Sequence, residues 1–386
     1  MWIYQLIAFL LVSLTPAHAE TLFIAYLGQE REDLRPATAN LEPLYPDLGI
    51  RGAELGIADN NTTGRFTNQS FRLLGAVIKQ GEDPTKAFYF LRKEGFRHVL
   101  INLPAEKLLA LADLPEAQGS LLYNVGAYED SLRGKDCRAN VLHTLPSHAM
   151  RADALGQYLK KKRWEKWFLV PGALPQDQLF AQALKRSAQR FGLKIVAAKP
   201  WTHAYDARRT AESEVAVFTQ GVDYDILLVA DESGLFGAYF PYRTWLPRPV
   251  AGTHGLIATA WHPAHEQWGA VQLQNRFKKL TGRWMQPEDY AAWLAVRAIG
   301  EAATRTQSTD FAAIEKYLLS DQLALPGFKG VPLSFRPWDG QLRQPILLAS
   351  AYDVVAVAPL EGFLHPSNEL DTLGYDARET ECRLKR

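Results

Sequence analysis

The sequence predicts an α/β fold of two lobes, each built on a parallel sheet that is doubly wound with helices. Two observations lead to this prediction. The chain has 386 residues, 47% of them hydrophobic, so it can bury a large core and exceeds the usual length of one compact domain. Short apolar, β-branched or aromatic runs alternate with helical patterns through the first two thirds, which is typical of parallel sheets with crossover helices.

The expected strands of the first two thirds are short runs at 22–27, 71–78, 99–103, 121–124, 167–170, 194–198 and 225–230. Between them, apolar residues recur at helical spacing. These helical faces are formed by Ile50, Ala53 and Ile57, by Ala152, Leu155 and Leu159, and by Phe180, Ala183, Leu184 and Phe191. Each strand is therefore expected to lead into a crossover helix.

The pattern of the last third changes to longer helices, expected at 262–280, 287–305 and 310–319. Two late β segments follow around Asp339-Gly340. An Asp-Gly pair between apolar or aromatic runs predicts a hairpin with a type I′ turn, because both central positions of that turn need a positive φ. No internal repeat or low-complexity tract interrupts the chain, which argues against a repeat architecture.

The first nineteen residues read as a secretory signal peptide cleaved after Ala19. An apolar run at 6–14 is too short to span a bilayer and is followed by Pro16 and the small-x-small sequence Ala17-His18-Ala19. The usual positive charges before the apolar run are missing, and a retained anchor is the alternative. No later segment approaches about 18 uninterrupted apolar residues. We therefore expect an exported protein that is not inserted in a membrane after cleavage.

Charge and cysteine content narrow the possible partners. The formal net charge is +1, and the one basic run, 160–163, closes an amphipathic helix, where cations favour the negative helix end. Nucleic acid is therefore not expected as a partner. Cys137 and Cys382 are the only cysteines. In an oxidising compartment such a pair predicts one disulfide, with two free buried thiols as the alternative.

No sequence motif supports catalysis. The P-loop, zinc-protease, nucleophile-elbow and dinucleotide-binding motifs are missing from the sequence. His262 and His265 share a helical face, but no third metal ligand is recognisable and a solvated helix start explains them. The run 59–64 imitates the opening of a calcium loop, yet Ser70 stands at position 12, where a bidentate Glu is required. We expect no enzyme, no catalytic cofactor and no metal.

Four segments of the mature chain are similar to parts of one known family. The segment 49–61 resembles that family's first helix, whose Asp/Asn turn precedes a glycine, here Gly64. The segment 124–127 resembles its fourth strand end, 146–159 the first helix of its second lobe, and 250–256 the second crossover between its lobes. Through the order and spacing of these segments, the mature chain resembles type 1 periplasmic binding proteins of the branched-chain amino-acid receptor kind over essentially its whole length.

A narrower resemblance is carried by the segments 247–253, 268–274, 338–345 and 361–365. These segments are similar to a branch associated with catabolism of alcohols that depends on pyrroloquinoline quinone (PQQ). It implies that PQQ, or an alcohol-derived substrate or product, is the ligand. Amino-acid receptors grip their ligand with a loop rich in Ser and Thr. The matching stretch here, 102–105, reads Asn-Leu-Pro-Ala, which argues against an ordinary amino acid.

The resemblance implies a type 1 periplasmic binding protein fold, with three crossover strands between the lobes. Residues 20–141 and 254–341 are expected in the first lobe, and 142–253 and 342–386 in the second. It further implies a monomeric periplasmic receptor that binds a small polar or anionic solute between its lobes and delivers it to a membrane ABC permease. A sensor of the same fold, for an alcohol-derived metabolite, an amino acid or an amide, is the alternative.

Ligands of this fold lie outside the carboxyl ends of the strands, between the lobes. Residues that follow the expected strand ends, and Trp261 after the second crossover, are therefore the candidate ligand contacts. They are Gln29, Glu30, Arg31, Asn102, Asn124, Ala127, Tyr128, Arg133, Gln176, Asp177, Tyr205, Asp231, Glu232 and Trp261. Arg suits carboxylates because its planar fork can bind them bidentately, and Trp and Tyr suit flat rings.

Several candidates also have a structural explanation. Arg31 can pair with its acidic neighbours on a solvated loop, and Trp261 can join the following helix to its lobe. Glu232 matches the acid that holds the ligand amine in amino-acid receptors, but it would repel the three carboxylates of PQQ unless it orients an arginine. Tyr205 and Asn124 are placed by strand ends alone, so core or loop roles remain open.

Overall fold

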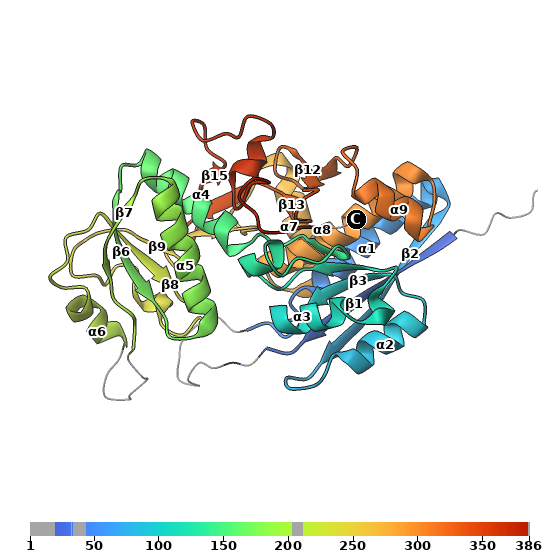
Figure 1. Ribbon diagram of the computed structural model, residues 1–386, viewed down its shortest axis with the longest axis horizontal. Helices are drawn as coiled ribbons and strands as arrows, with labels where there is room; N and C mark the ends of the chain where they lie inside the picture. The colour runs from blue at the N-terminus through green and yellow to red at the C-terminus, as the bar shows by residue number, and fades with distance from the viewer. Residues whose placement is uncertain (1–19, 32, 34–43, 203–210, 385–386) are drawn as a thin grey trace, which may run out of the picture.

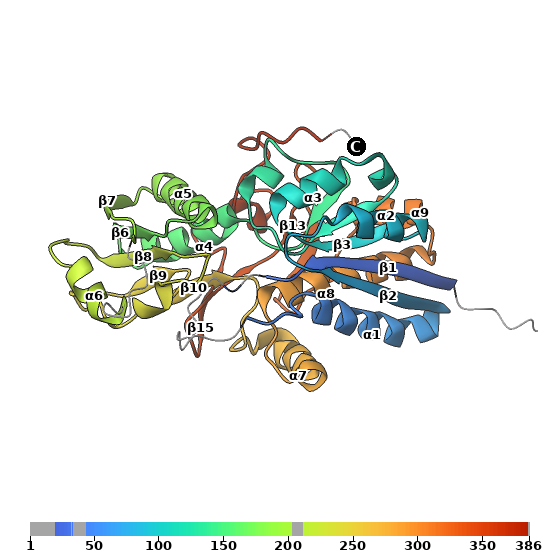
Figure 2. The ribbon, with the colours of Figure 1, turned by 90° about the horizontal axis from the view of Figure 1, so that it is seen from below.

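The computed structural model describes residues 20–31, 33, 44–202 and 211–384, which form two lobes side by side (Figures 1 and 2). Each lobe is built on its own sheet. The expected signal peptide, 1–19, and Tyr205 lie outside the described residues. Within the described ranges, no helix is long and apolar enough to cross a membrane.

The first lobe has a fully parallel sheet in the order β2-β1-β3-β4-β5. Alternate residues of β1 face opposite layers. Ile24 and Tyr26 pack with the helices on one face, whereas Ala25 and Leu27 pack with those on the other. The strands are β1 (Glu20–Gln29), β2 (Gln69–Ile78), β3 (His98–Asn102), β4 (Leu121–Asn124) and β5 (Val141–His143).

Helices from both ends of the chain cover this sheet, which is therefore doubly wound as predicted. One face is covered by α1 (Ile50–Thr67), α7 (Ala270–Thr281), α8 (Pro287–Thr306) and α9 (Phe311–Leu318). The other face is covered by α2 (Thr85–Lys93) and α3 (Ala105–Ala112). The short strands β11 (Leu325–Pro326), β12 (Pro332–Phe335) and β13 (Leu342–Arg343) form a small antiparallel sheet.

The second lobe has a seven-stranded sheet in the order β15-β14-β10-β9-β8-β6-β7. Its parallel part consists of β6 (Lys166–Pro171), β7 (Lys194–Ala198), β8 (Ile226–Ala230), β9 (Val250–Gly252) and β10 (Leu256–Thr259). The strands β14 (Ile346–Ala349) and β15 (Val354–Ala358) add to one edge in antiparallel orientation, so this sheet is mixed. One face carries α4 (His148–Lys161) and α5 (Pro175–Arg190), and the other carries α6 (Ala211–Phe218).

The chain passes between the lobes after β5, after β10 and after β13. The expected boundaries at 141/142 and 341/342 lie next to the first and third of these passages. The expected boundary at 253/254 precedes β10, which pairs with β9 and β14 in the second sheet.

Two buried glutamines join the first and third crossovers. Gln341 Nε2 donates to the carbonyl oxygens of His143 (3.2 Å) and Leu145 (3.1 Å). Gln344 Nε2 donates to the carbonyl oxygen of Thr144 at 2.7 Å. Both side chains also accept, Gln341 from Arg133 Nε (2.9 Å) and Gln344 from Lys329 Nζ (3.2 Å). The two crossover segments are therefore held side by side.

Three local predictions need correction. The helix expected at 262–280 begins only at Ala270, because Trp268 (φ 53°) and Gly269 (φ 81°) have left-handed backbone conformations that end the preceding short helix. The hairpin of β12 and β13 is real, but residues 336–341 connect the strands and only Gly340 has a positive φ, so the turn is not type I′. Helix α1 runs unbroken through 59–64, where the resemblance implied a turn.

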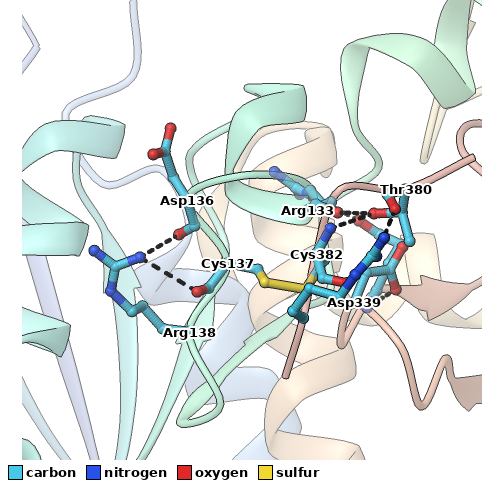
Figure 3. Close-up of a disulfide and its surroundings, with 9 residues drawn as sticks. Arg133, Asp136, Cys137, Arg138, Asp339, Thr380 and Cys382 are labelled. Carbon is cyan, nitrogen blue, oxygen red and sulfur yellow. Dashed lines mark hydrogen bonds between the residues drawn. A yellow bond between two sulfur atoms is a disulfide. The ribbon is translucent and has the colours of Figure 1, made fainter. Parts of the chain in front are cut away.

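The two cysteines form a disulfide that joins Cys137 of the first lobe to Cys382 near the chain end (Figure 3). The prediction of one disulfide is confirmed, and the alternative of two free thiols is wrong.

Close packing of α1 against α8 depends on glycine. A Cβ added to Gly52 would lie 1.8 Å from the carbonyl oxygen of Asp289, which is backbone and cannot move aside. Asp289 in turn accepts a hydrogen bond from the backbone nitrogen of Gly49 at 2.8 Å. The start of α1 is therefore fixed against the start of α8.

We predict that Gly52→Ala lowers the free energy of unfolding by about 1–3 kcal/mol, because the added methyl group overpacks the contact with α8. Helix propensity alone would stabilise the variant by about 1 kcal/mol, so the sign of the change isolates the packing effect. Urea denaturation measures it. The control is Thr62→Ala on the exposed side of the same helix, which should change stability little. Equal stability of Gly52→Ala and the wild type would contradict the prediction.

Candidate functional site

A cavity of about 440 Å³ lies between the lobes, outside the carboxyl ends of strands from both sheets. Its volume lies within the range typical of small-molecule sites. The first lobe lines it with Gln29, Glu30, Arg31, Leu44, Gln80, Asn102, Leu103, Pro104, Gly126, Tyr128, Glu129 and Glu288. The second lobe lines it with His148, Gln176, Glu232 and Ser233.

Half of the fourteen candidate contacts line this cavity: Gln29, Glu30, Arg31, Asn102, Tyr128, Gln176 and Glu232. The reason is visible in the topology. Gln29 ends β1 and Asn102 ends β3, its hydrogen-bonded neighbour in the sheet, so their side chains reach the same edge. That these residues contact a ligand remains a prediction.

On the first lobe, an ion pair forms one wall of the cavity. Arg31 Nη2 donates to Glu288 Oε1 at 2.9 Å, and the nearby negative charge of Glu288 raises the pKa of Arg31. Glu288 lies in the first turn of α8, where the helix dipole stabilises a carboxylate. Arg31 thus pairs with a residue that lies 257 positions away in the sequence.

On the second lobe, Arg151 and Glu232 form a second ion pair. Arg151 Nη1 donates to Glu232 Oε1 at 2.8 Å, and both side chains are mostly buried. The guanidinium also lies over the rings of Tyr128 (4.9 Å) and Phe180 (4.7 Å). Burial raises the pKa of Glu232, and the charge of Arg151 opposes that shift. Glu232 therefore orients an arginine, as the sequence left open.

The polar groups near the first-lobe strand ends are held in place by other groups. Asn102 Nδ2 donates to Tyr26 Oη (2.9 Å) and to the carbonyl oxygen of Leu48 (3.1 Å). Lys107 Nζ donates to Gln29 Oε1 at 2.9 Å. These hydrogen bonds fix the side chains before any ligand arrives, which lowers the entropic cost of binding.

Tyr128 and His148 meet where the two lobes come together. Their rings stack, with centroids 5.7 Å apart and planes inclined by 22°. Burial, aided by the charges of Arg151 and Arg133, lowers the pKa of His148 well below its usual value. The imidazole at this side of the cavity is therefore neutral at pH 7.

Three candidate residues of the first lobe do not line the cavity. Asn124 caps its own turn, since its Oδ1 accepts from the backbone nitrogen of Ala127 at 2.8 Å. Ala127 itself is buried. Arg133 is buried and donates to Gln341 and to the carbonyl oxygens of Ala127 and Leu145, so it supports the crossovers. These three residues near the strand end therefore stabilise the local fold and do not form the cavity wall.

Two acids of the second lobe likewise cap neighbouring turns. Asp177 accepts from the backbone nitrogens of Ser233 (2.9 Å) and Leu174 (3.2 Å). Asp231 accepts from those of Leu235 (3.0 Å) and Phe236 (2.9 Å). Neither lines the cavity, although Asp177 orients Ser233, which does.

Trp261 is the clearest correction. Only 1% of it is exposed, its ring stacks on Tyr290 at 4.5 Å, and its Nε1 donates to Gln274 Oε1 at 2.7 Å. It belongs to the core of the first lobe, so the structural explanation for this residue is the right one.

Sequence reasoning missed further lining residues, some of which the strand-end argument could have found. Leu103 and Pro104 directly follow β3, and Gln80 comes two residues after β2. Glu129 and Ser233 adjoin candidates. Other missed groups come from helix starts, such as Glu288 of α8, His148 of α4 and, behind Glu232, Arg151. Candidates chosen only from strand ends do not include residues at the starts of helices.

Carboxylates outnumber cations around the cavity. Among the described lining residues there are four glutamates, Glu30, Glu129, Glu232 and Glu288, and one arginine, Arg31. Arg151 adds a second guanidinium behind Glu232, and both arginines are already paired with a glutamate. The described wall is therefore acidic and favours hydrogen-bond donors and cations.

Comparison with known proteins supports the fold. A family model described as periplasmic binding protein matches residues 92–210. A leucine-, isoleucine-, valine-, threonine- and alanine-binding protein from Brucella ovis, in its closed conformation, is similar with a TM-score of 0.68 and 14% identity over 95% of this chain and 100% of that chain. No curated protein sequence matches significantly.

Two further solved structures share the fold. One is a branched-chain amino acid ABC transporter periplasmic ligand-binding protein from Burkholderia xenovorans, with a TM-score of 0.70 and 15% identity over 94% of this chain and 99% of that chain. The other is a solute-binding protein of an ABC transporter from Rhodopseudomonas palustris in complex with 3,4-dihydroxybenzoic acid, with a TM-score of 0.59 and 11% identity over 86% and 93% of the chains. The chain has the type 1 periplasmic binding protein fold.

We predict that Trp261→Ala lowers the free energy of unfolding by about 3–5 kcal/mol, because it empties a large core site. Chemical denaturation followed by circular dichroism measures the change. The control is Trp245→Ala, where the ring is 55% exposed and the loss should be much smaller. If the Trp261→Ala variant were as stable as the wild type but bound ligand more weakly, Trp261 would instead be a ligand-binding residue.

Proposed function

We propose that the chain is the extracytoplasmic binding subunit of an ABC-type uptake system, which encloses a small polar solute between its lobes and delivers it unchanged to a membrane permease. The observation that carries the proposal is one cavity lined by polar side chains from both lobes at the carboxyl edges of both sheets. The reported structures of the same fold are solute-binding proteins.

The two-lobed wall supports a receptor that closes on its ligand. A ligand that contacts Arg31 and Glu288 on one side and Gln176 and Glu232 on the other stabilises the closed arrangement over the open one. A permease can then distinguish the ligand-bound protein from the ligand-free protein by its closed form. Glu288 and Glu232 of this wall are each tied into an ion pair with an arginine, an arrangement suited to holding a solute and not to transferring protons.

The charge of the wall guides the choice of ligand. A ligand with amine or amide N–H groups would satisfy carboxylates such as Glu30 and Glu129. Leu103 and Pro104 bring no side-chain hydroxyl group for a ligand carboxylate, so an ordinary α-amino acid fits less well. PQQ has three carboxylates and would meet four glutamates and two arginines that are already paired. We therefore propose a small solute that carries an amine or amide group.

A ligand panel tests this proposal. We expect amines or amides to raise the melting temperature of ligand-free protein in a panel that includes leucinamide, L-leucine, 3,4-dihydroxybenzoate and PQQ. Binding at a hundredfold excess over Kd stabilises by about 2.7 kcal/mol, which thermal unfolding and calorimetry detect readily. Stabilisation by PQQ or by 3,4-dihydroxybenzoate alone would reinstate an anionic aromatic ligand.

Glu232→Gln tests the role of the second-lobe acid. We predict that it weakens binding of the amine or amide found in the panel at least tenfold, or about 1.4 kcal/mol, because it removes a carboxylate and leaves Arg151 without its ion-pair partner. Titration calorimetry measures the affinity. Glu94→Gln, an exposed acid at the end of α2, is the control and should bind as the wild type does. Unaltered affinity in Glu232→Gln would exclude the acid from recognition.

A further inference from the structure

The segment 369–382 crosses between the lobes after β15 and is here named the C-terminal strap. It begins at the second lobe and ends over the first, as the dark red ribbon shows (Figures 1 and 2). Along its length it is attached first to one lobe and then to the other, at three places.

The first attachment is to the β12–β13 hairpin of the first lobe. Asp371 Oδ1 accepts from Arg336 Nε at 2.9 Å and from Arg343 Nε at 2.8 Å. Arg336 is only 1% exposed and also donates to the carbonyl oxygens of Leu370 (3.0 Å) and Leu373 (2.8 Å). This arginine therefore holds both backbone and side chain of the strap.

The second attachment is to α4 and α5 of the second lobe. The backbone nitrogen of Gly374 donates to Asp153 Oδ2 at 2.9 Å, and its carbonyl oxygen accepts from Arg186 Nη2 (2.8 Å) and Arg190 Nη1 (2.6 Å). Glu379 adds ion pairs to the same two arginines at 3.4 and 3.3 Å. Asp153 is fully buried, so its bond to Gly374 is shielded from water, whereas the Glu379 ion pairs are partly exposed.

The third attachment returns the strap to the first lobe. Thr380 Oγ1 donates to the carbonyl oxygen of Arg133 at 2.8 Å, and Cys382 is bonded to Cys137 (Figure 3). Unlike the other two attachments, this one includes a covalent bond, which water cannot replace as it can replace a hydrogen bond.

The spacing of the attachments limits how far they can separate. Three positions lead from Asp371 on the first lobe to Gly374 on the second, and three lead from Glu379 back to Cys382. A fully extended chain spans at most about 3.6 Å per residue, so each link reaches roughly 11 Å. While the strap stays fixed to the first lobe at both ends, the two lobes can separate further next to the strap only if the second attachment breaks.

The strap also lies next to the ligand cavity. Glu129 lines the cavity, and its neighbour Asp130 lines a separate hollow of about 200 Å³ together with Tyr375 and Glu379 of the strap. Asp130 Oδ1 further accepts from the backbone nitrogen of Ala149, at the start of α4, at 2.9 Å. The strap and the cavity wall therefore adjoin the same short helix, Asp130–Arg133.

We propose that the C-terminal strap is a fourth connection between the lobes, in addition to the three crossovers, and that the Cys137–Cys382 bond makes it a limit on how far the lobes open. With the bond intact, the strap is fixed to the first lobe on both sides of the second attachment, at Asp371 before it and at Cys382 after it. With the bond reduced, the strap is held to the first lobe only by noncovalent contacts, which can break in place of the second attachment, so the lobes open further.

Single-molecule energy transfer tests the proposal without a ligand, so its outcome is independent of the proposed function. Fluorophores are attached through non-canonical amino acids at Gln118 of the first lobe and Lys185 of the second, both exposed. We expect dithiothreitol to broaden the distance distribution toward longer values, and reoxidation to restore it. Cys137 and Cys382 are the only cysteines, so reduction changes no other bond.

Two variants complete the experiment. Cys137→Ser with Cys382→Ser should match the reduced wild type, and near-ultraviolet circular dichroism checks its folding. Arg378→Gln alters an exposed strap residue outside the three attachments and should match the oxidised wild type. Coincident distance distributions for oxidised and fully reduced wild type would overturn the proposal, and this comparison needs no variant to fold.

Discussion

The arrangement of the two lobes depends on the hydrogen bonds of Gln341 and Gln344 at the crossovers. Each amide bridges segments that lie about 200 residues apart in sequence, with donors and acceptor both used. A buried carbonyl group left without a partner costs about 1–3 kcal/mol, so these side chains replace the pairing that a continuous sheet would provide. Because they hold the first and third crossovers together, the carboxyl edges of the two sheets face one cavity.

Most of the fold could be predicted because it depends on local patterns. The seven expected strands are present within one or two residues at each end, since short apolar runs bounded by polar turns are read directly from the sequence. The strands β5, β9 and β10 were not among the expected strands. They are only three or four residues long, which is too short for a periodic pattern to be recognised. The delayed start of α7 arises from the left-handed backbone at Trp268, a non-glycine residue that gives no such signal.

The candidate site was predicted only in part, for a physical reason. Strand ends collect polar residues for two purposes, ligand contact and capping of the next turn, and sequence alone does not separate them. Gln29 and Glu232 reach the cavity, whereas Asn124 and Asp231 accept backbone hydrogen bonds a few residues further on. The pairs Arg31–Glu288 and Arg151–Glu232 join elements far apart in sequence, and such pairing is decided by the tertiary fold.

The distribution of tryptophan has a consequence for spectroscopy. No tryptophan is among the described residues that line the cavity, while Trp261 and Trp293 are stacked with Tyr290 deep in the first lobe. Intrinsic emission from those rings reports the integrity of the core and not the arrival of a solute. An optical sensor that uses tryptophan emission therefore needs an added dye at the cavity, since Trp261 and Trp293 do not line it.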